Sequence, residues 1–309
     1  MEQMRCLGPG DAGALRQLAE RIGWSFTPEQ AALYVGGIGR VFGLWRDGGL
    51  VATAALHPYD GRVARLGNVM VDPAHRRQGL ATRLLKACLA EARSASLRVC
   101  LVATEMGEPL YRKLGFETIE FIHRFVFDPA RPLSPQPAAM GNVRRLEPGD
   151  LRDVVRLDER AFGASRRSLI EALFTGGAHA WAHMAEDGVH QDFAFGLQRS
   201  RRRMSGVYSG RVCQGFALGL QRSSRTNLGA VVADAVSIAQ ALVAYACEEL
   251  TETRALVRLD VPGWQTDFRA WLAASGFREE CVSPLMQFGH ARDCGAWSRW
   301  FALYDPALG

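Results

Sequence analysis

The stretch 66–93 constrains the fold of this chain more than any other part of it. It begins with an apolar segment that ends at Val71, turns at an Asp-Pro pair, and continues through a basic loop with the sequence RRQGLA at 76–81. The apolar residues that follow, at 80, 84, 85, 88, 89 and 92, recur at helical spacing. The pattern predicts a strand, a tight loop and an amphipathic helix in direct succession.

A strand, a loop and a helix N-terminus in this order form a geometry that binds phosphate. The amides of the first helical turn have no partner within the helix, and the helix dipole favours negative charge there. Gly79 allows the backbone to approach a ligand closely, and Arg76 and Arg77 add positive charge. The sequence therefore predicts an anion site at this loop, with a basic strand-to-helix turn as the plainer alternative.

Two motifs together resemble the GNAT N-acetyltransferases. Arg76-x-x-Gly79-x-Ala81 is similar to the acetyl-CoA loop of that family, and the segment 109–116, PLYRKLGF, is similar to its second signature, P-x-Y-x-x-x-G-F. The resemblance implies that loop amides hold the pyrophosphate of acetyl-CoA and that the end of the preceding strand aligns the pantetheine arm. The cofactor-binding residues that it implies are Val69, Met70, Val71, Arg76, Arg77, Gln78, Gly79, Leu80, Ala81 and Thr82.

The resemblance also implies a catalytic role for Tyr111, which matches the family tyrosine that protonates the departing thiolate. The alternative is a core tyrosine whose hydroxyl reaches the surface. The family often places a basic glutamate on the strand before the loop, but 63–71 contains no carboxylate. A water relay to bulk solvent is therefore our first choice of proton acceptor. The residues that stay open for this role, or for ordering the water, are His57, Asp60, Asn68 and Glu105.

Residues 1–127 read as alternating strands and helices in the order β-α-α-β-β-β-α-β-α-β, which the GNAT resemblance also implies. Proline at four positions between 129 and 137 then predicts an extended, semi-rigid linker over 128–141. We expect the segment before the linker to fold and bind acetyl-CoA by itself.

The chain beyond the linker repeats landmarks of the first part. The sequence LEPGD at 146–150 is similar to LGPGD at 7–11, and Gly276-Phe277 repeats Gly115-Phe116. The sequence therefore predicts an α/β fold with a mixed sheet, as two tandem GNAT-like domains: a catalytic domain, 1–127, and a second domain, 142–309. Equivalent residues of the two copies are 139 positions apart at the first landmark (150 − 11) and 161 apart at the second (276 − 115). The second copy is therefore 22 residues longer between its landmarks. A duplication inside the second copy, where 193–200 is similar to 216–223, accounts for nearly all of this growth.

The second copy lacks the cofactor machinery. Its equivalent strand-to-helix segment, 228–235, contains no arginine pair and no R-x-x-G-x-A motif, and Leu272 aligns with Tyr111. We therefore expect the second domain to be degenerate at the cofactor loop and to shape the acceptor side of the first domain's cleft.

The composition argues against a membrane, secreted or metal-binding protein. The chain has 309 residues, 48% hydrophobic residues, a net charge of +5 and seven scattered cysteines without metal-binding spacing. No segment reads as a membrane helix or a signal peptide, so we expect a cytoplasmic protein without a metal or a membrane partner.

The expected function is transfer of an acetyl group from acetyl-CoA to a primary amine by direct attack. The acceptor stays open among small amines, antibiotics, amino acids and protein lysines, and so does the oligomeric state. One rival is a non-catalytic acyl-CoA sensor. The other is a nucleic-acid-binding protein, which we do not expect, because a solvated loop explains its basic cluster: Arg199, Arg201, Arg202, Arg203 and Arg211.

Overall fold

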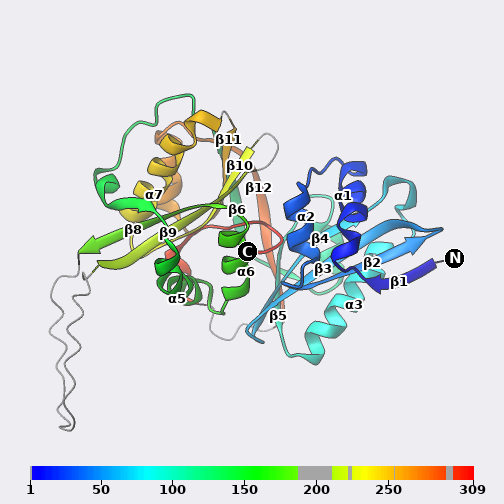
Figure 1. Cartoon of the computed structure of the whole chain (residues 1–309). Coiled ribbons are helices and arrows are strands. Elements are labelled where there is room, and N and C mark those ends of the chain that lie inside the picture. The colour runs from blue at the N-terminus through cyan, green and yellow to red at the C-terminus, as the bar shows by residue number, and fades with distance from the viewer. Residues whose placement is uncertain (1, 187–210, 222–224, 254, 290–294) are drawn as a thin grey trace, which may run out of the picture.

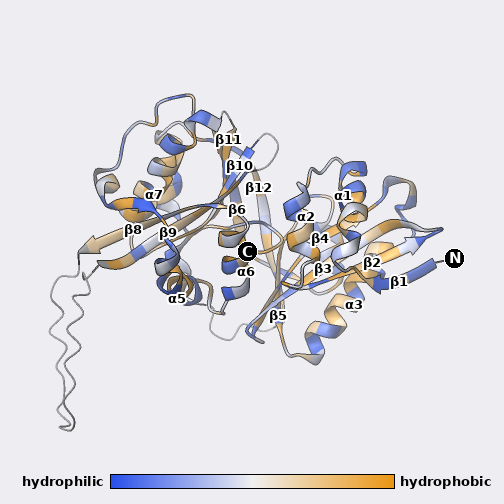
Figure 2. Cartoon of the chain, viewed as in Figure 1, coloured by the Kyte–Doolittle hydropathy of each residue, from blue (hydrophilic) through white to orange (hydrophobic). Residues whose placement is uncertain are grey.

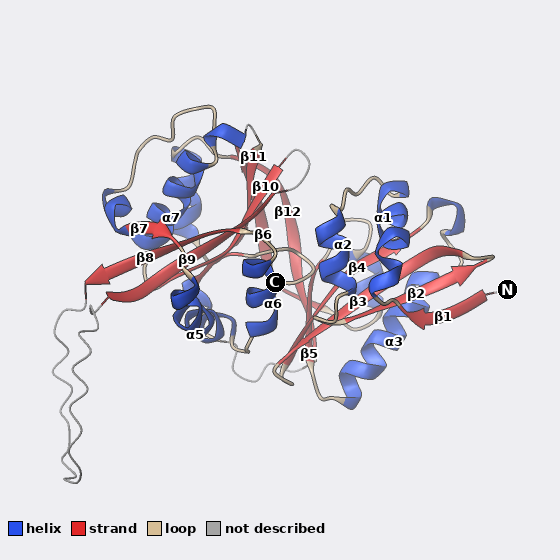
Figure 3. Ribbon diagram, viewed as in Figure 1, coloured by secondary structure: helices blue, strands red, loops and turns tan. Residues whose placement is uncertain are grey.

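The computed structural model describes residues 2–186, 211–221, 225–253, 255–289 and 295–309. The strands that it describes join in one mixed sheet, with helices on both faces (Figures 1 and 3). The strands are β1 (Glu2–Cys6), β2 (Arg40–Arg46), β3 (Gly49–Tyr59), β4 (Val63–Val71), β5 (Arg98–Val102), β6 (Glu117–Phe127), β7 (Val143–Arg145), β8 (His179–Glu186), β9 (Arg211–Gln221), β10 (Arg225–Ala233), β11 (Leu256–Pro262), β12 (Arg278–Phe288) and β13 (Trp300–Ala302). The helices are α1 (Ala12–Arg21), α2 (Pro28–Val35), α3 (Leu80–Ser94), α4 (Glu108–Lys113), α5 (Leu151–Phe162), α6 (Arg167–Thr175), α7 (Val236–Glu249) and α8 (Thr266–Ala274).

The predicted α/β class and the element order of the first part are confirmed. The order from β1 to β6 is β-α-α-β-β-β-α-β-α-β, and β7 to β12 follow the same order. The first half, from β1 to β6, and the second half, which begins with β7, thus contain two copies of one arrangement. Both copies have the predicted mixed α/β fold.

Matching contacts support the repeat at the level of side chains. Arg5 forms an ion pair with Asp11, with an N···O distance of 2.7 Å. Arg144 and Asp150, each 139 residues further along the chain, form the same pair at 2.7 Å. At the other end, the glycines of the two Gly-Phe pairs both have positive φ, 91° at Gly115 and 95° at Gly276. Those values lie in the left-handed region that glycine tolerates and that ends a helix.

The two halves exchange their last long strands. The sheet order through the middle is β4-β5-β12-β6-β11-β10, so β12 from the second half pairs with β5, and β6 from the first half pairs with β11 (Figure 1). Phe116 accordingly packs against Phe288, while its repeat equivalent Phe277 stacks on Phe127. Each half is therefore completed by a strand of the other.

The buried hydrophobic side chains of the described residues form three cores. One core contains the buried faces of α1, α2, α5 and α6 and crosses from one half to the other. The second lies under α7 and α8 and includes Phe125 and Phe127 of β6, and the third lies under α3 and includes Met286 of β12. Figure 2 shows hydrophobic residues along the strands and on parts of the helices. The exchange thus puts residues of each half into the other half's core.

The proline-rich segment after β6 is packed rather than free. Leu133 is buried in the core under α7, and the carbonyl of Pro129 accepts a hydrogen bond from Thr251 at 3.3 Å. Gln136 also donates to Glu248 on α7 at 2.7 Å. The segment turns at 129–130 and forms a 3-10 helix over Ala138–Asn142, so the prediction of an extended linker over 128–141 is wrong. It lies against the second half and does not act as a spacer between separate bodies.

Candidate active site

The centre of the first half is a gap between β4 and β5. The two strands run parallel and pair only from Val63 to Arg65, opposite Arg98 to Cys100, and then diverge. Beyond Arg65 the side of β4 that faces β5 has no strand partner among the described residues. Such a gap leaves main-chain donors and acceptors available to an extended ligand.

A bulge in β4 lies within this gap. The register to β3 slips between the pairs Thr53–Met70 and Ala55–Gly67, and Asn68 has a φ of 49°. The carbonyl of Asn68 accepts a hydrogen bond from the Thr53 hydroxyl at 2.8 Å. Bulges of this kind change the direction of main-chain groups next to a site.

The basic loop follows directly from β4 and leads into α3. Asp72 caps the turn by accepting from the amide of Ala74 at 3.0 Å, and Gly79, with a φ of 75°, is the N-cap of α3. The first bond within the helix runs from the amide of Arg83 to the carbonyl of Gly79 at 3.1 Å. The amides of residues 80–82 precede this bond and point out of the helix end, and residues 76–79 are exposed.

A cavity of about 460 Å³ opens at the gap. The first half contributes the loop between α1 and α2, the bulge of β4, the end of β5 and Tyr111. The second half contributes β10, β11, β12 and the C-terminal segment. The lining residues that carry the argument below are Asn68, Val69, Tyr111, Arg124, Arg225, Asn227, Arg258 and Asp305.

The residues implied by the resemblance divide between the cavity and the loop. Val69 and Tyr111 line the cavity, whereas Met70 is buried in the core and Val71 begins the approach to the loop. Two residues of β4 follow Val69 before the strand ends at Val71, a distance of about 7 Å at the usual rise of a strand. The cavity and the loop are therefore two ends of one path along β4.

Tyr111 has the environment that a proton donor needs. It lies on α4, its ring packs edge-on against Phe116 with centroids 5.8 Å apart, and only 8% of the residue is exposed. Burial raises the pKa of its hydroxyl above the ordinary value. The phenol therefore keeps its proton at neutral pH while it lines the cavity.

The open candidates for proton acceptor are mostly outside the cavity. His57 is fully buried in the sheet, and burial lowers its pKa to about 4, while Asp60 and Glu105 are exposed in turns. Asn68 lines the cavity and can order water there. Sequence reasoning missed Asp305, the carboxylate that lines the cavity among the described residues.

Asp305 belongs to a C-terminal segment that packs between the halves. The Tyr59 hydroxyl donates to the carbonyl of Leu308 at 2.9 Å, and Arg65 donates to that of Pro306 at 3.0 Å. A Cβ on Gly67 would lie 2.3 Å from the Cβ of Ala307, so only glycine lets the segment cross β4 here. No sequence motif signals this contact, because it joins residues about 240 positions apart.

Three arginines on the second-half side of the cavity were also missed. Arg124 lies on β6, Arg225 on β10 and Arg258 on β11, and all three line the cavity. Arg124 donates to Asp260 at 2.8 Å, and Arg258 binds the same carboxylate. The three arginines are far apart in the sequence. They lie close together because the strand exchange puts β6, with Arg124, next to β11.

The equivalent gap in the second half is filled by protein. β10 and β11 pair at Arg225–Leu256 to Asn227–Arg258 and then diverge, as β4 and β5 do. Here β13 enters the gap and pairs with Val231 and Val232 of β10, and Leu303 bridges to Asp260. Only residues 234 and 235 join β10 to α7, in place of the long basic loop. The predicted degeneracy of the second copy thus has a structural basis.

Three further expectations concern metals, membranes and nucleic acid. In the ranges that the structure describes, no group of three or more His, Cys, Asp or Glu side chains is placed to hold a metal ion. No helix within those ranges combines the length and apolar character that crossing a membrane requires. Of the basic cluster, residues 199–203 lie outside the described residues, as does the duplicated arm 193–200, while 216–221 form part of β9.

Comparison with protein-family models gives two matches of one kind. A model described as an acetyltransferase (GNAT) domain matches residues 37–118, and another with the same description matches residues 196–302. The "Uncharacterized N-acetyltransferase YitH" of Bacillus subtilis is 24% identical over 308 residues, which cover 96% of this chain and 95% of that protein.

Solved structures share the fold over nearly the whole chain. A putative acetyltransferase from Pyrococcus horikoshii superimposes with a TM-score of 0.75 at 16% identity, covering 100% of this chain and 96% of that one. A tandem GNAT protein from the clavulanic acid biosynthesis pathway gives a TM-score of 0.63 at 15% identity, covering 94% of this chain and 100% of that one. The arrangement of two copies is therefore shared with other proteins.

Proposed function

Because the chain belongs to the GNAT acetyltransferases and contains two of their domains, we propose that it transfers the acetyl group of acetyl-CoA to a primary amine. The observation that carries the proposal is the path along β4, which joins a helix N-terminus beside two exposed arginines to a cavity lined by a buried tyrosine. Acetyl-CoA has the same order of parts: a pyrophosphate, an extended arm and a reactive thioester.

The residues present fit such a ligand at both ends. The amides of 77–82 and the side chains of Arg76 and Arg77 suit the pyrophosphate, because a helix N-terminus and guanidinium groups both favour phosphate. The unpaired side of β4 at 69–71 suits the amide groups of the pantetheine arm, which bind as an added strand does. Acetyl-CoA supplies the activated acetyl group at the cavity end.

The side chains of the cavity then do two things. Tyr111 donates its proton to the thiolate that leaves, because its raised pKa keeps the hydroxyl protonated until strong negative charge develops. The proton of the amine passes to Asp305, either directly or through water held by Asn68, and from there to solvent. The amine attacks the thioester directly, since none of the described cavity-lining residues is a cysteine.

We further propose that the repeat units are 1–127 and 142–309, joined by 128–141, and that one acetyl-CoA binds per chain. We place the protein in the cytoplasm on the ground of its cysteines: the six in the described residues are free thiols.

The test is thiol release from acetyl-CoA with the full chain across a panel of amines, preceded by calorimetry without an amine. We expect binding without an amine and release only with one. Binding without release for every amine would favour the sensor function instead.

Two variants test the position of the pyrophosphate. Gly79→Glu puts a negative charge at the α3 N-terminus, and we expect acetyl-CoA affinity to fall by tenfold or more. Gly79→Ala imposes the same backbone strain at positive φ without the charge, so it is the matched control. Equal affinities for the two variants would move the site elsewhere.

A further inference from the structure

We propose that the acceptor of this reaction carries a carboxylate as well as its amine, as an amino acid or a short peptide does, and that Arg225 and Arg258 hold that carboxylate. The inference rests on the proposed function, since it names the acceptor class of the same cavity. It goes beyond that function because nothing in acetyl transfer itself requires a charged acceptor.

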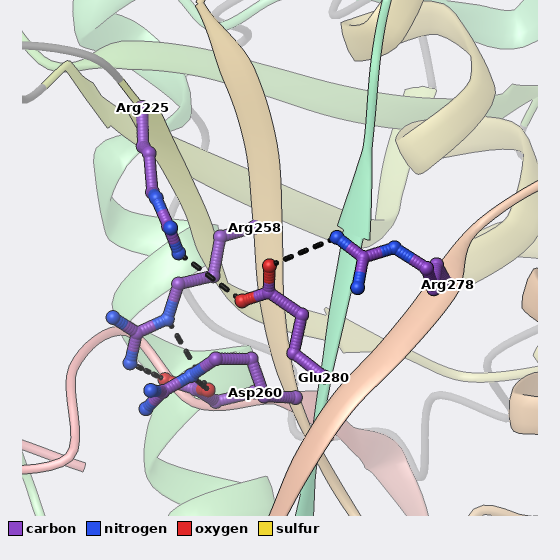
Figure 4. Close-up of polar contacts among 6 residues, drawn as sticks. Arg225, Arg258, Asp260, Arg278 and Glu280 are labelled. Carbon is purple, nitrogen blue, oxygen red and sulfur yellow. Dashed lines mark hydrogen bonds and ion pairs between the residues drawn. The ribbon is translucent and has the colours of Figure 1, made fainter.

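The cavity has a cationic wall that comes from the second half and from β6. Figure 4 shows Arg225 and Arg278 directed at Glu280 from either side, with Arg258 beside Asp260 below them. The Arg225–Glu280 and Arg278–Glu280 distances are both 3.2 Å. Arg258 and Arg124 share Asp260, of which the side chain is 5% exposed. Arg278 is in this network but does not line the cavity.

The network has more positive charge than it can neutralise. Three arginines that line the cavity, at 124, 225 and 258, face two carboxylates, at 260 and 280, so the sum for this wall is 3 − 2 = +1. Burial alone would raise the pKa of Asp260, but Arg258 and Arg124 outweigh it and hold that pKa below its ordinary value. Asp260 therefore stays ionised between the two arginines, and the excess positive charge of the wall stays at the cavity.

The guanidinium groups also have donors to spare. Each carries five N–H groups, and Arg225 has one contact through Nη1 to Glu280 among the described residues. Arg124 likewise uses its Nε toward Asp260. A planar guanidinium with two parallel N–H groups is the preferred partner of a carboxylate. The donors that remain are suited to one more carboxylate, which the ligand would bring.

Two buried amide side chains give a second, independent sign of a polar ligand. Asn68 and Asn227 line the cavity, each is 4% exposed, and Nδ2 of Asn68 and Oδ1 of Asn227 have no hydrogen-bond partner in the described structure. A buried polar atom without a partner costs about 1–3 kcal/mol. Asn227 is paired in register with Arg258, so an N–H group of an amino acid or peptide held there can donate to its Oδ1.

The opposite charge lies on the C-terminal segment. Asp305 lines the same cavity, with Oδ1 accepting from the amide of Ala307 at 2.7 Å. A carboxylate favours the ammonium form of an arriving amine and then accepts its proton. The arginines and Asp305 thus match the two charges of an amino acid, and the aromatic residues at 24, 26 and 34 supply an apolar side to the cavity.

The test compares pairs of acceptors that differ only at the carboxylate. Amino acids, their carboxamides and the corresponding decarboxylated amines are assayed for thiol release with the full chain, at equal concentrations of unprotonated amine. We expect kcat/KM to be at least tenfold higher for the carboxylate member, mostly through KM. Aminoalkylphosphonates are a further arm, which separates carboxylate from phosphonate recognition. Equal values within the pairs, or a preference for the uncharged member, would overturn the proposal.

Substitution then assigns the preference to the cationic wall. Arg225→Gln should raise KM for the carboxylate acceptors by tenfold or more and leave the carboxamides unchanged, so the preference should disappear. Arg278→Gln is the matched control, because it removes a partner of the same Glu280 outside the cavity. Loss of the preference in Arg278→Gln as well, or equal damage to both acceptor classes in Arg225→Gln, would show that the arginines only hold the strands together.

A binding measurement separates this proposal from the proposed function. Calorimetry with N-acetyl amino acids and their carboxamides, in the presence of CoA, needs no turnover. If no amine supports thiol release but the N-acetyl amino acids bind and lose affinity in Arg225→Gln, the acetyl-transfer function fails and the carboxylate site stands. If an amine supports thiol release but only the carboxamides of the N-acetyl amino acids bind, the acetyl-transfer function stands and the carboxylate site fails.

Discussion

Tyr111 is the residue on which the proposed chemistry depends most directly. Tyr111→Phe keeps the ring packed on Phe116 and removes only the proton donor. We expect kcat to fall by roughly 100-fold, the usual contribution of a general acid, while acetyl-CoA affinity changes little. The measurement is single-turnover kinetics, in which chemistry limits the rate. A wild-type rate in that experiment would remove the acid role from Tyr111.

His57 provides a prediction about stability rather than catalysis. Burial lowers its pKa to about 4 in the folded chain, whereas an unfolded histidine titrates near about 6.5. Between these values the unfolded state binds a proton that the folded state does not, so the free energy of unfolding falls as the pH falls through this range. The loss should reach about 2 kcal/mol near pH 5.

Urea denaturation at about pH 7 and about pH 5 measures this dependence. His57→Gln should remove most of the loss, and His75→Gln, at a partly exposed turn, should keep it. The same slope in the wild type and in His57→Gln would assign the acid sensitivity to other groups.

At the scale of elements, the C-terminal segment and β4 depend on each other through Gly67. Gly67→Ala would put a Cβ 2.5 Å from the Cα of Ala307, so the segment would have to move away from the cavity. We expect a loss of about 1–3 kcal/mol in unfolding free energy, the usual cost of overpacking, together with a higher KM for the acceptor. Acetyl-CoA affinity should fall less, because the loop at 76–82 is separate from this contact.

The control for Gly67→Ala is an alanine substitution at a glycine where an added Cβ meets no other atom. Gly13 lies in α1 with nothing within 4 Å of an added Cβ, and alanine there should add up to about 1 kcal/mol by helix propensity. If Gly67→Ala were as stable and active as Gly13→Ala, the segment would not shape the site.

The elements also show how far sequence reasoning reaches. The strand β4, the basic loop and α3 could be predicted, because their signals are local: an apolar run, a glycine just before the helix and a helical periodicity. The cationic wall could not, since Arg124, Arg225 and Arg258 meet only through pairing between strands of different halves. The two landmarks of the repeat predicted two copies of the fold correctly, but they do not indicate how the strands of the two copies pair. Whether β12 pairs within its own half or with β5 is decided by non-local packing, which no local pattern records.

At the scale of the whole molecule, the asymmetry of the two gaps predicts the stoichiometry. β13 occupies the gap between β10 and β11, whereas the corresponding gap between β4 and β5 opens into the cavity. We expect calorimetry to give one acetyl-CoA per full-length chain. A value of two would mean that β13 leaves its gap when the ligand arrives.

The strand exchange also revises the expectation that the first half folds alone. Without β12, the fragment 1–128 would leave β5 as an open edge, and its β6 would have no β11 to pair with. We now expect this fragment to be insoluble when produced alone and to form a soluble complex when produced together with 129–309. A soluble, cooperative fragment 1–128 by itself would contradict this revision.

The exchange has a consequence for how the chain is made. β5 leaves the ribosome early, but its neighbour β12 begins 176 residues after β5 ends (278 − 102). At about 5–20 residues per second, β5 waits roughly 9 to 35 s for its partner. During that time the nascent first half exposes a strand edge, and a β12 from another chain could pair with it. Slow codons between β6 and β12 would lengthen this exposure, so the yield of monomer should depend on the rate of translation over that stretch.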